Sequence, residues 1–355
     1  MRIEIRVGSE SYDVLIGPTI LDGVGNTVKQ AMTERVCALI SDANVAVSYG
    51  QRVSESLASA GFAPVLISVP AGEQSKTLEQ VERVSDRMLE AGLDRHSFVV
   101  GLGGGVIGDL SGFVAAIFQR GIAHVQIPTT LLAMVDSSIG GKNGVNTILG
   151  KNMLGAVHHP SLVIDDIEVL KTLPRRELNQ GFAEIIKHAI IADAEMFRSL
   201  ENLDRDSVDF SDLVRRNIEI KARFVAKDEL DRTGDRALLN FGHTVAHGIE
   251  RAADYREILH GEAVSLGIVA AAAISRKKAG LAADQQQAIV DLLEKFELPT
   301  RLPKDLPRRK ILESLKFDKK FERGKIRFVV TPKIGSAHLS RDITIEDIRE
   351  AVDEL

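Results

Sequence analysis

The sequence predicts an α/β domain with a largely parallel sheet over residues 1–171, followed by an all-α C-terminal domain over residues 172–355. Short β-rich apolar runs alternate with helical stretches in the first half, which is typical of βα units. From about Thr172 onward, stretches rich in Ala, Glu, Lys and Leu dominate and strand signals nearly vanish. At 355 residues the chain also exceeds the length at which one core is comfortable.

The individual elements follow from local patterns. A helix is expected from Leu78 to Ala91, because its apolar residues recur at helical spacing and Gly92 follows. Pro174 can open the first helix of the second domain. A short strand over 326–330 and a terminal helix over 345–352 complete the second domain. The expected strands of the first domain are Arg2 to Val7, Val36 to Ser41, Val65 to Val69, Phe98 to Leu102, His124 to Ile127 and Leu162 to Ile164.

Composition excludes several classes of protein. The net charge is -5 and no basic run carries interleaved aromatic residues, which argues against nucleic-acid binding. No apolar run has membrane length, and the N-terminus lacks a secretory signal, so we expect a cytoplasmic protein without a membrane partner. The single cysteine, Cys37, lies in the apolar run VCALI and predicts a buried, inert thiol.

A glycine-rich turn follows the strand FVVGL. Residues 103–109, GGGVIGD, match GxGxxG and precede a helical stretch, the arrangement that binds a phosphate at a helix N-terminus. Glycines that only pack a helix against a sheet explain this pattern equally well, and the turn follows the third or fourth strand rather than the first. Polar residues at two further strand ends, Asp42 with Asn44 and residues 70–76, favour one extended dinucleotide. Alternatively, Asp42 is a helix N-cap and Glu73 a solvated charge.

The stretch 127–146 has little charge apart from Asp136 and Lys142, which lie among Ser and Gly. With Lys151 nearby, it predicts a loop that binds a phosphate or carboxylate, although surface lysines are the simpler explanation. His158 and His159 are adjacent in an extended segment, so their side chains should point apart, and we do not assign them as metal ligands.

A third set combines glutamate and histidine. Glu184, Lys187 and His188 share one face of a predicted helix. His243 and His247 are one helical turn apart, and His260 follows with Glu262. A Glu and two His from separate segments are typical of a catalytic zinc site, and spacing alone suggests that His243 and His247 share the metal. The alternative is that these are hydrogen-bonded core histidines.

Taken together, these runs resemble the 3-dehydroquinate synthases. The residues that carry the resemblance span 42–320 and occur in the order typical of that family. They are DAN, PAGEQSK, GGGVIGDLSGFVAA, IPTTLLAMVDSSIGGKNGVN, GKNMLGA, GFAEIIKHA, RALLNFGHT, HGEAV and FDKK.

The resemblance implies an NAD-binding N-terminal domain, a C-terminal domain that binds Zn²⁺ or Co²⁺, and a homodimer with catalysis in the cleft between the domains. The implied metal ligands are Glu184, His243 and His260, with His247 facing substrate instead. The implied substrate contacts are Asp136, Lys142, Lys187, Lys221, Arg236, Asn240, His247 and either Lys319 or Lys320, with Arg120 reaching the partner's site. The implied NAD contacts are Asp42, Asn44, Glu73, Lys76, Gly104, Gly105, Val106, Asp109, Thr129, Thr130, Lys142, Lys151, Thr172, Leu173 and Glu177.

The implied reaction converts 3-deoxy-D-arabino-heptulosonate 7-phosphate, a phosphorylated sugar acid, to 3-dehydroquinate and phosphate in the shikimate pathway. It combines transient oxidation at C5, β-elimination of phosphate, re-reduction, ring opening and an intramolecular aldol closure. That chemistry makes the enzyme a carbon–oxygen lyase that regenerates its NAD. The lysines and Arg236 would hold the phosphate charge.

Two departures from the family pattern stand out. The segment between Lys221 and Arg236 carries one residue more than is common, and GAVHHP stands where an aromatic residue is frequent. Three other functions fit part of the pattern: a sister cyclase that makes 2-epi-5-epi-valiolone or 2-deoxy-scyllo-inosose, a metal-dependent polyol dehydrogenase, and a non-catalytic binding protein. Asn240, His247 and the FDKK lysines favour dehydroquinate synthase over the sister cyclases.

Overall fold

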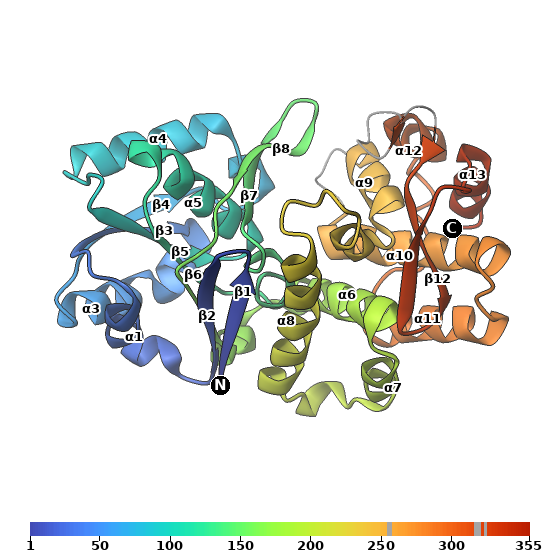
Figure 1. Ribbon diagram of the computed structural model, residues 1–355, viewed down its shortest axis with the longest axis horizontal. Helices are drawn as coiled ribbons and strands as arrows, with labels where there is room; N and C mark the ends of the chain where they lie inside the picture. Colours follow the sequence, from blue (N-terminus) through green and yellow to red (C-terminus); the bar gives the residue numbers. More distant parts are fainter. Residues whose placement is uncertain (254–257, 316–320, 323–324) are drawn as a thin grey trace. The chain divides into compact units, whose positions relative to one another are not determined.

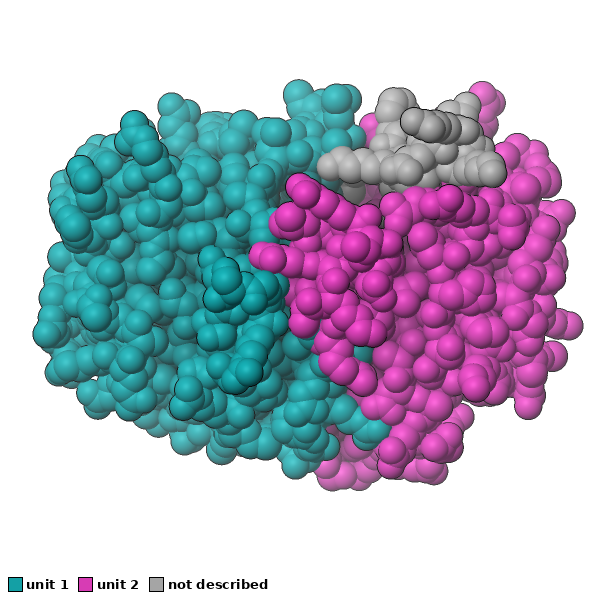
Figure 2. Space-filling model, viewed as in Figure 1, with its two compact units in different colours: residues 1–174, 209–222 teal, residues 175–208, 223–355 magenta. Residues whose placement is uncertain are grey.

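The computed structural model describes residues 1–253, 258–315, 321–322 and 325–355. The chain divides into two compact units (Figure 2). Unit 1 comprises residues 1–174 and 209–222, and unit 2 comprises 175–208 and 223–355. The units therefore do not follow a single cut of the chain, because the segment 209–222 belongs with residues 1–174. This segment is the first part of helix α8 (Phe210–Lys227), whose composition matches that of the helices in unit 2.

Unit 1 is built on a seven-stranded sheet in the order β1-β2-β9-β6-β5-β3-β4. Only β1 and β2 pair antiparallel, and the other neighbours are parallel, which confirms the largely parallel sheet. All six expected strands are present within two residues of their predicted bounds. The strands of this sheet are β1 (Arg2–Val7), β2 (Glu10–Gly17), β3 (Val36–Asp42), β4 (Ala63–Val69), β5 (Ser97–Gly103), β6 (His124–Pro128) and β9 (Leu162–Asp166).

Helices cover both faces of this sheet (Figure 1). Ala38 and Ile40 of β3 belong to a core cluster that includes residues of α4 and α5. Because side chains alternate along a strand, the equally buried Cys37 and Leu39 face the opposite side, where α1 and α3 lie. Burial on both faces explains the continuous apolar runs of the parallel strands. The helices of unit 1 before α8 are α1 (Val24–Ala31), α2 (Ala43–Val45), α3 (Gln51–Ser59), α4 (Leu78–Glu90) and α5 (Gly105–Ile117).

Two features of unit 1 differ from the sequence prediction. Strand β2 was missed, although Tyr12, Val14 and Ile16 alternate as buried residues within it. The segment interpreted as a loop contains instead an antiparallel hairpin of β7 (Lys142–Thr147) and β8 (Gly150–Val157). Its glycines and polar residues do not resemble a strand pattern, and the cross-strand pairing that stabilises it is not a local property.

Unit 2 is mainly helical. Helix α10 (His260–Lys278) runs through its middle and contacts α6, α9, α11, α13 and β12 (Figure 1). The expected return to strand is present and forms a hairpin of β12 (Phe328–Lys333) with β13 (Ser336–Ser340). The remaining elements of this unit are α6 (Arg175–Ala192), α7 (Ala194–Asn202), α9 (His243–Ala252), α11 (Ala283–Lys295), α12 (Arg308–Leu315), α13 (Ile345–Asp353), β10 (Phe321–Glu322) and β11 (Lys325–Ile326).

Within the part of the chain that the structure describes, no helix is long and apolar enough to cross a membrane. Cys37 is fully buried, and burial raises the pKa of its thiol to about 12. The predicted burial of the cysteine is therefore confirmed, and a thiol with a raised pKa is a poor nucleophile.

Candidate active site

Unit 2 brings one carboxylate and two imidazoles together. Glu184 lies on α6, His243 begins α9 and His260 begins α10. The Nε2 atoms of His243 and His260 lie 3.5 and 3.7 Å from Oε1 of Glu184, and the three potential ligand atoms lie within 4.8 Å of one another. These residues are 59 and 17 positions apart along the sequence, so only the packing of three helices unites them.

Hydrogen bonds on the far side of each ring determine its tautomer. Nδ1 of His243 lies 3.2 Å from the carbonyl oxygen of Phe241, which can only accept a hydrogen bond. Nδ1 of His260 lies 3.1 Å from Oε1 of the buried Glu250. Both rings therefore carry their proton on Nδ1, and in the neutral imidazole the lone pair is on Nε2, the atom that faces Glu184.

The oxygen at the centre of this group has an unusual environment. Glu184 is fully buried, and its Oε1 has no hydrogen-bond partner among the described residues, whereas Oε2 accepts a hydrogen bond from Lys187. Distances of 3.5 and 3.7 Å are too long for charge-assisted hydrogen bonds from imidazolium rings. Tetrahedral zinc with ligands at about 2.0–2.2 Å separates neighbouring ligand atoms by about 3.4 Å. The group thus fits a divalent cation.

Close helix packing explains why the three residues converge. The amide of Gly261 donates a hydrogen bond to Oε1 of Gln180, 3.2 Å away, and a Cβ at Gly261 would lie 2.5 Å from the Cα of Gln180. Only glycine lets α10 begin this close to α6, one helical turn before Glu184. Gly242, with φ of 79°, likewise brings the start of α9 against the backbone of Ile268 in α10.

The other residues of this set have different roles. The ring of His247 is exposed and lies edge-on to that of His243, with 5.6 Å between centroids, and His247 is not among the three converging residues. The spacing argument for a metal shared by His243 and His247 therefore has no support, because the converging ligand atoms belong to Glu184, His243 and His260. Glu262 accepts a hydrogen bond from the amide of Leu259 and pairs with Arg176 at 2.6 Å, so it caps α10.

The segment with the additional residue folds around one carboxylate. Asp228 accepts hydrogen bonds from the backbone amides of residues 232, 233, 234 and 236, at 2.7–3.4 Å. Although desolvation opposes it, this set of donors holds the pKa of the Asp228 carboxyl well below its usual value. Arg236 follows directly, is buried, and donates to the carbonyl of Glu229 at 2.6 Å. Asn240 ends the short 3-10 segment Arg236–Asn240 and is half-buried.

In unit 1, the glycine-rich turn has the predicted strand, turn and helix geometry. Strand β5 ends at Gly103, and α5 begins at Gly105, with Gly104 at the N-cap and therefore no side-chain cap from that residue. The packing explanation also holds in part, because a Cβ at Gly103 would lie 2.7 Å from the side chain of Ile107. At Gly108 it would lie 3.2 Å from Oε1 of Gln126. Val106 and Asp109 lie in the first turns of α5. The amides at the start of a helix that has no N-cap side chain can donate hydrogen bonds to a phosphate.

Charged residues predicted to bind NAD are paired with one another. Lys76 and Asp109 form a buried ion pair with 2.5 Å between Nζ and Oδ2. Burial raises the pKa of the Asp109 carboxyl, and the ammonium of Lys76 opposes that rise. Nζ of Lys151 lies 3.9 Å from Glu73. The structure therefore brings together charged residues from three separate segments of the chain.

Asn146, which the sequence analysis did not single out, links these segments. Its side-chain amide donates to Oε1 of Glu73 at 2.7 Å, its Oδ1 accepts from the amide of Asn152 at 3.0 Å, and its own amide donates to the carbonyl of Lys76 at 2.8 Å. Asn152 has a φ of 53°, a left-handed conformation that asparagine tolerates. Because the bonding partners are remote in sequence, nothing in the local pattern identifies Asn146.

The predicted substrate contacts of unit 1 lie on several different segments of the chain. Nζ of Lys221, on the first part of α8, contacts both the carbonyl oxygen and Oδ1 of Asp136, the latter at 2.5 Å. Lys142 begins β7 and is exposed. Arg120 is also exposed and has a φ of 75°, next to Gln119 with a φ of 50°. Lys319 and Lys320 lie outside the described residues.

The remaining predicted NAD contacts lie at the ends of elements. Asp42 ends β3, and its Oδ1 accepts hydrogen bonds from the amides of Asn44 and Val45 at 2.9 and 3.1 Å, so the N-cap explanation applies to it. Thr129 and Thr130 follow β6, and Thr172 hydrogen-bonds Tyr49 at 2.7 Å just before Leu173. Glu177 lies in unit 2, where burial raises the pKa of its carboxyl.

Two further features do not belong to these groups. His158 stacks on His124 and His159 stacks on Tyr12, so the prediction that adjacent histidines point apart is confirmed.

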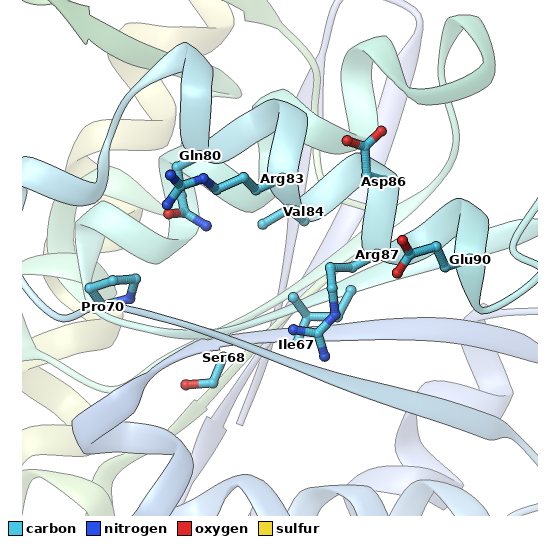
Figure 3. A pocket seen from close by; sticks show the side chains of 9 residues that line it. All are labelled: Ile67, Ser68, Pro70, Gln80, Arg83, Val84, Asp86, Arg87 and Glu90. Carbon is cyan, nitrogen blue, oxygen red and sulfur yellow. The ribbon is translucent and has the colours of Figure 1, made fainter.

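A pocket of about 370 Å³ lies between β4 and α4, lined by side chains that include Ser68, Arg83 and Arg87 (Figure 3). None of the predicted site residues that the structure describes lines it.

Comparison with known proteins identifies the family. The model of the 3-dehydroquinate synthase N-terminal region matches residues 66–180, and that of the C-terminal region matches residues 181–321. The chain belongs to the 3-dehydroquinate synthase family. It is 42% identical to the 3-dehydroquinate synthase of Desulforamulus reducens over 98% of each chain. It is 43% identical to that of a Nostoc species over 99% of each chain.

Solved structures of two sister enzymes share the fold of this 3-dehydroquinate synthase family member. A 2-epi-5-epi-valiolone synthase from Streptomyces hygroscopicus, with NAD⁺ and Zn²⁺ bound, superimposes with a TM-score of 0.89, 30% identity and 98% coverage of both chains. A 2-deoxy-scyllo-inosose synthase, in complex with carbaglucose-6-phosphate, NAD⁺ and Co²⁺, has a TM-score of 0.90 at 24% identity, covering 100% of this chain and 99% of that one. The second comparison supports the fold alone.

Proposed function

We propose that this chain converts 3-deoxy-D-arabino-heptulosonate 7-phosphate to 3-dehydroquinate and phosphate. Family membership and full-length relatives of 42 and 43% identity support that substrate over those of the sister cyclases. The structural observation that carries the proposal is the convergence of Glu184, His243 and His260 around an oxygen that has no hydrogen-bond partner among the described residues.

Glu184, His243 and His260 would hold the divalent cation, zinc or cobalt, through Oε1 and the two Nε2 atoms. Three protein ligands leave one coordination position for substrate, the arrangement of catalytic rather than structural zinc. When bound, the cation polarises substrate oxygens and NAD acts as a reversible hydride acceptor. Lys187 is directly beside this group, because its Nζ donates to Oε2 of Glu184. Its ammonium can therefore hold Glu184 in place and present a further N–H to a substrate hydroxyl.

The substrate carries a phosphate and a carboxylate, and the proposed contacts are suited to both. Arg236 presents a buried guanidinium, and Lys142 presents an exposed ammonium. Cationic donors of this kind stabilise the charge that develops on a departing phosphate. We assign Asp136, Lys221, Asn240 and His247 to substrate binding on the family pattern, and Lys319 or Lys320 with them. Holding the ring-opened product in one conformation is enough to favour an intramolecular aldol closure.

NAD is assigned to unit 1. The first amides of α5 suit its pyrophosphate, because they carry no side-chain cap and lie at the positive end of the helix dipole. Lys76 and Lys151 supply nearby positive charge. Asp42, Asn44, Gly104, Thr129, Thr130, Thr172 and Leu173 complete the proposed set in unit 1, and Glu177 of unit 2 is assigned to NAD on the family pattern.

The proposal extends to a homodimer in which Arg120 serves the partner's site. Its side chain is exposed, and two consecutive left-handed residues, Gln119 and Arg120, hold the backbone in a conformation that costs about 1–3 kcal/mol per residue. Such strain persists where the surrounding structure requires it. Mixing inactive Arg120→Ala subunits with subunits inactivated at His260 should restore activity only if Arg120 acts across an interface.

One assay tests the reaction. Purified protein is incubated with catalytic NAD, zinc and the heptulosonate phosphate, while phosphate release and NADH absorbance are recorded together. Phosphate without net NADH supports the proposal. Net NADH formation indicates a polyol dehydrogenase, turnover only of a seven-carbon sugar phosphate without the acid group indicates a sister cyclase, and absence of any product indicates a binding protein.

A further inference from the structure

Helix α9 contributes a second buried side chain beside the metal group, in addition to the predicted ligand His243. Glu250 lies seven residues after His243, two helical turns along the same face. It is 1% exposed, and its Oε1 lies 3.1 Å from Nδ1 of His260 on the neighbouring helix α10. The same face of α9 therefore carries a predicted ligand and the hydrogen-bond acceptor of a second ligand.

The two histidines are held in unequal ways. Nδ1 of His243 donates to a backbone carbonyl two residues away, which is a neutral acceptor that needs no tertiary contact. Nδ1 of His260 donates to a carboxylate on another helix. The side chain of His260 is also 29% exposed, against 10% for His243, so fewer neighbours restrict its ring. The ring of His260 is therefore held by a hydrogen bond between two helices, whereas that of His243 is bonded within its own segment.

The charges around His260 also give Glu250 a role. His260 is the first residue of α10, where the positive end of the helix dipole disfavours a cation and reduces the electron density that Nε2 can offer. A buried carboxylate on Nδ1 acts in the opposite direction, since it withdraws the proton partially and makes Nε2 a stronger donor to a metal.

We propose that Glu250 is a positioning residue that keeps His260 in its Nδ1-protonated tautomer and thereby raises the affinity of the site for a divalent cation. The inference rests on the proposed metal role of Glu184, His243 and His260. Glu250 itself does not ligate the cation, since it contacts the ring nitrogen remote from Glu184.

The test compares two variants by direct zinc binding. Apo-protein is titrated with zinc in competition with a chromophoric chelator. Glu250→Met removes the acceptor and should raise the apparent dissociation constant for zinc about 10- to 100-fold. Glu250→Gln keeps an acceptor oxygen but removes the charge, so a smaller rise separates the hydrogen bond from the charge. Glu294→Gln, an exposed site on α11, is the control and should bind as the wild type does.

Three further readouts distinguish positioning from general damage. Unfolding temperatures of the apo-forms should agree within a few degrees, and the visible spectrum of the Co²⁺ form should change in Glu250→Met. Activity of Glu250→Met should recover as zinc is raised, because the defect lies in metal affinity. Zinc affinity in Glu250→Met equal to that of the wild type overturns the inference while leaving the metal site intact. A wild-type protein that binds no zinc overturns the proposed metal site itself.

Discussion

The predicted metal site of unit 2 and the charged cluster of unit 1 differ in the partners that surround their polar side chains. In unit 1, Lys76 pairs with Asp109, Lys151 lies near Glu73 and Lys221 contacts Asp136. In unit 2, three electron-pair donors converge, and one oxygen of Glu184 has no hydrogen-bond partner within the described part of the chain.

The difference shows two routes to a ligand site. A group of like acceptors is an unfavourable arrangement until a cation occupies it, so the site is organised in advance for metal. Paired lysines and acids are neutral overall, so their charge is balanced without a ligand, but the lysines must change partners when an anion binds. In unit 2 Lys187 already pairs with Oε2 of Glu184, so a bound cation would satisfy Oε1 and the two Nε2 lone pairs. In unit 1 the charged side chains are paired with one another.

The largest effect is expected at the metal group. His260→Ala should remove one ligand and lower turnover by about 10³-fold, since Lewis-acid stabilisation of several kcal/mol is lost at 1.36 kcal/mol per factor of ten. Metal content, measured by atomic emission, should fall in parallel. His247→Ala should retain its metal, because His247 is not among the converging residues. Wild-type rate and metal content in His260→Ala would remove the assignment.

The paired cluster should respond through stability. Lys76→Met leaves Asp109 buried without its cation and should lower the free energy of unfolding by about 3–5 kcal/mol, measured by urea denaturation. The double variant Lys76→Met/Asp109→Leu should recover most of this loss, because it removes both charges. An unchanged midpoint in the single variant would show that the pair contributes nothing.

The same variant has a pH signature. Burial already raises the pKa of Asp109, and loss of Lys76 should raise it further. An acid with a raised pKa contributes stability below the unfolded pKa of about 3.9 and loses it as the pH rises through the folded value. The deficit of Lys76→Met should therefore grow from acidic to neutral pH.

Helix packing beneath the metal group provides a third test. Gly261→Ala places a Cβ 2.5 Å from the Cα of Gln180, so α10 must shift away from α6. Overpacking of this kind costs about 1–3 kcal/mol, and zinc affinity should fall because His260 moves with the helix. Gly23→Ala is the matched control, since no atom lies within 4 Å of its Cβ position. Equal zinc affinity in Gly261→Ala and Gly23→Ala would show that the contact does not position His260.

The smallest effect is expected at Asp165, a buried carboxylate in the sheet of unit 1. Both oxygens of Asp165 in β9 are buried with no hydrogen-bond partner among the described residues, whereas the neighbouring Asp166 accepts from the amides of Thr19 and Leu21 at 3.0 and 2.9 Å. Asp165 belongs to no group of converging ligands. Asp165→Val should therefore stabilise the protein, by about 1 kcal/mol or more.

The pH dependence of this gain has a definite sign. Burial holds the pKa of Asp165 well above its usual value, so the wild type loses stability as the pH rises toward that raised pKa. The advantage of Asp165→Val should increase between pH 5 and pH 9 in chemical denaturation, and zinc should not alter it. A gain that shrinks with rising pH would contradict the burial of an unpartnered carboxyl.

Much of the architecture follows from sequence alone. Local patterns predict the apolar parallel strands, the helix α4 and the glycine turn between β5 and α5. They do so because the direction of side chains repeats at a fixed interval along a helix or a strand. The ordered family motifs also predicted the metal ligands, including Glu184 and His260.

Tertiary structure decided which of those residues meet. Spacing paired His243 with His247, yet the three-helix contact at Gly261 and Gly242 selects His260 instead. The β7–β8 hairpin, the membership of residues 209–222 in unit 1 and the roles of Asn146 and Glu250 have the same origin. Each depends on atoms brought within a few ångströms from positions distant along the chain, and no local periodicity encodes such a distance.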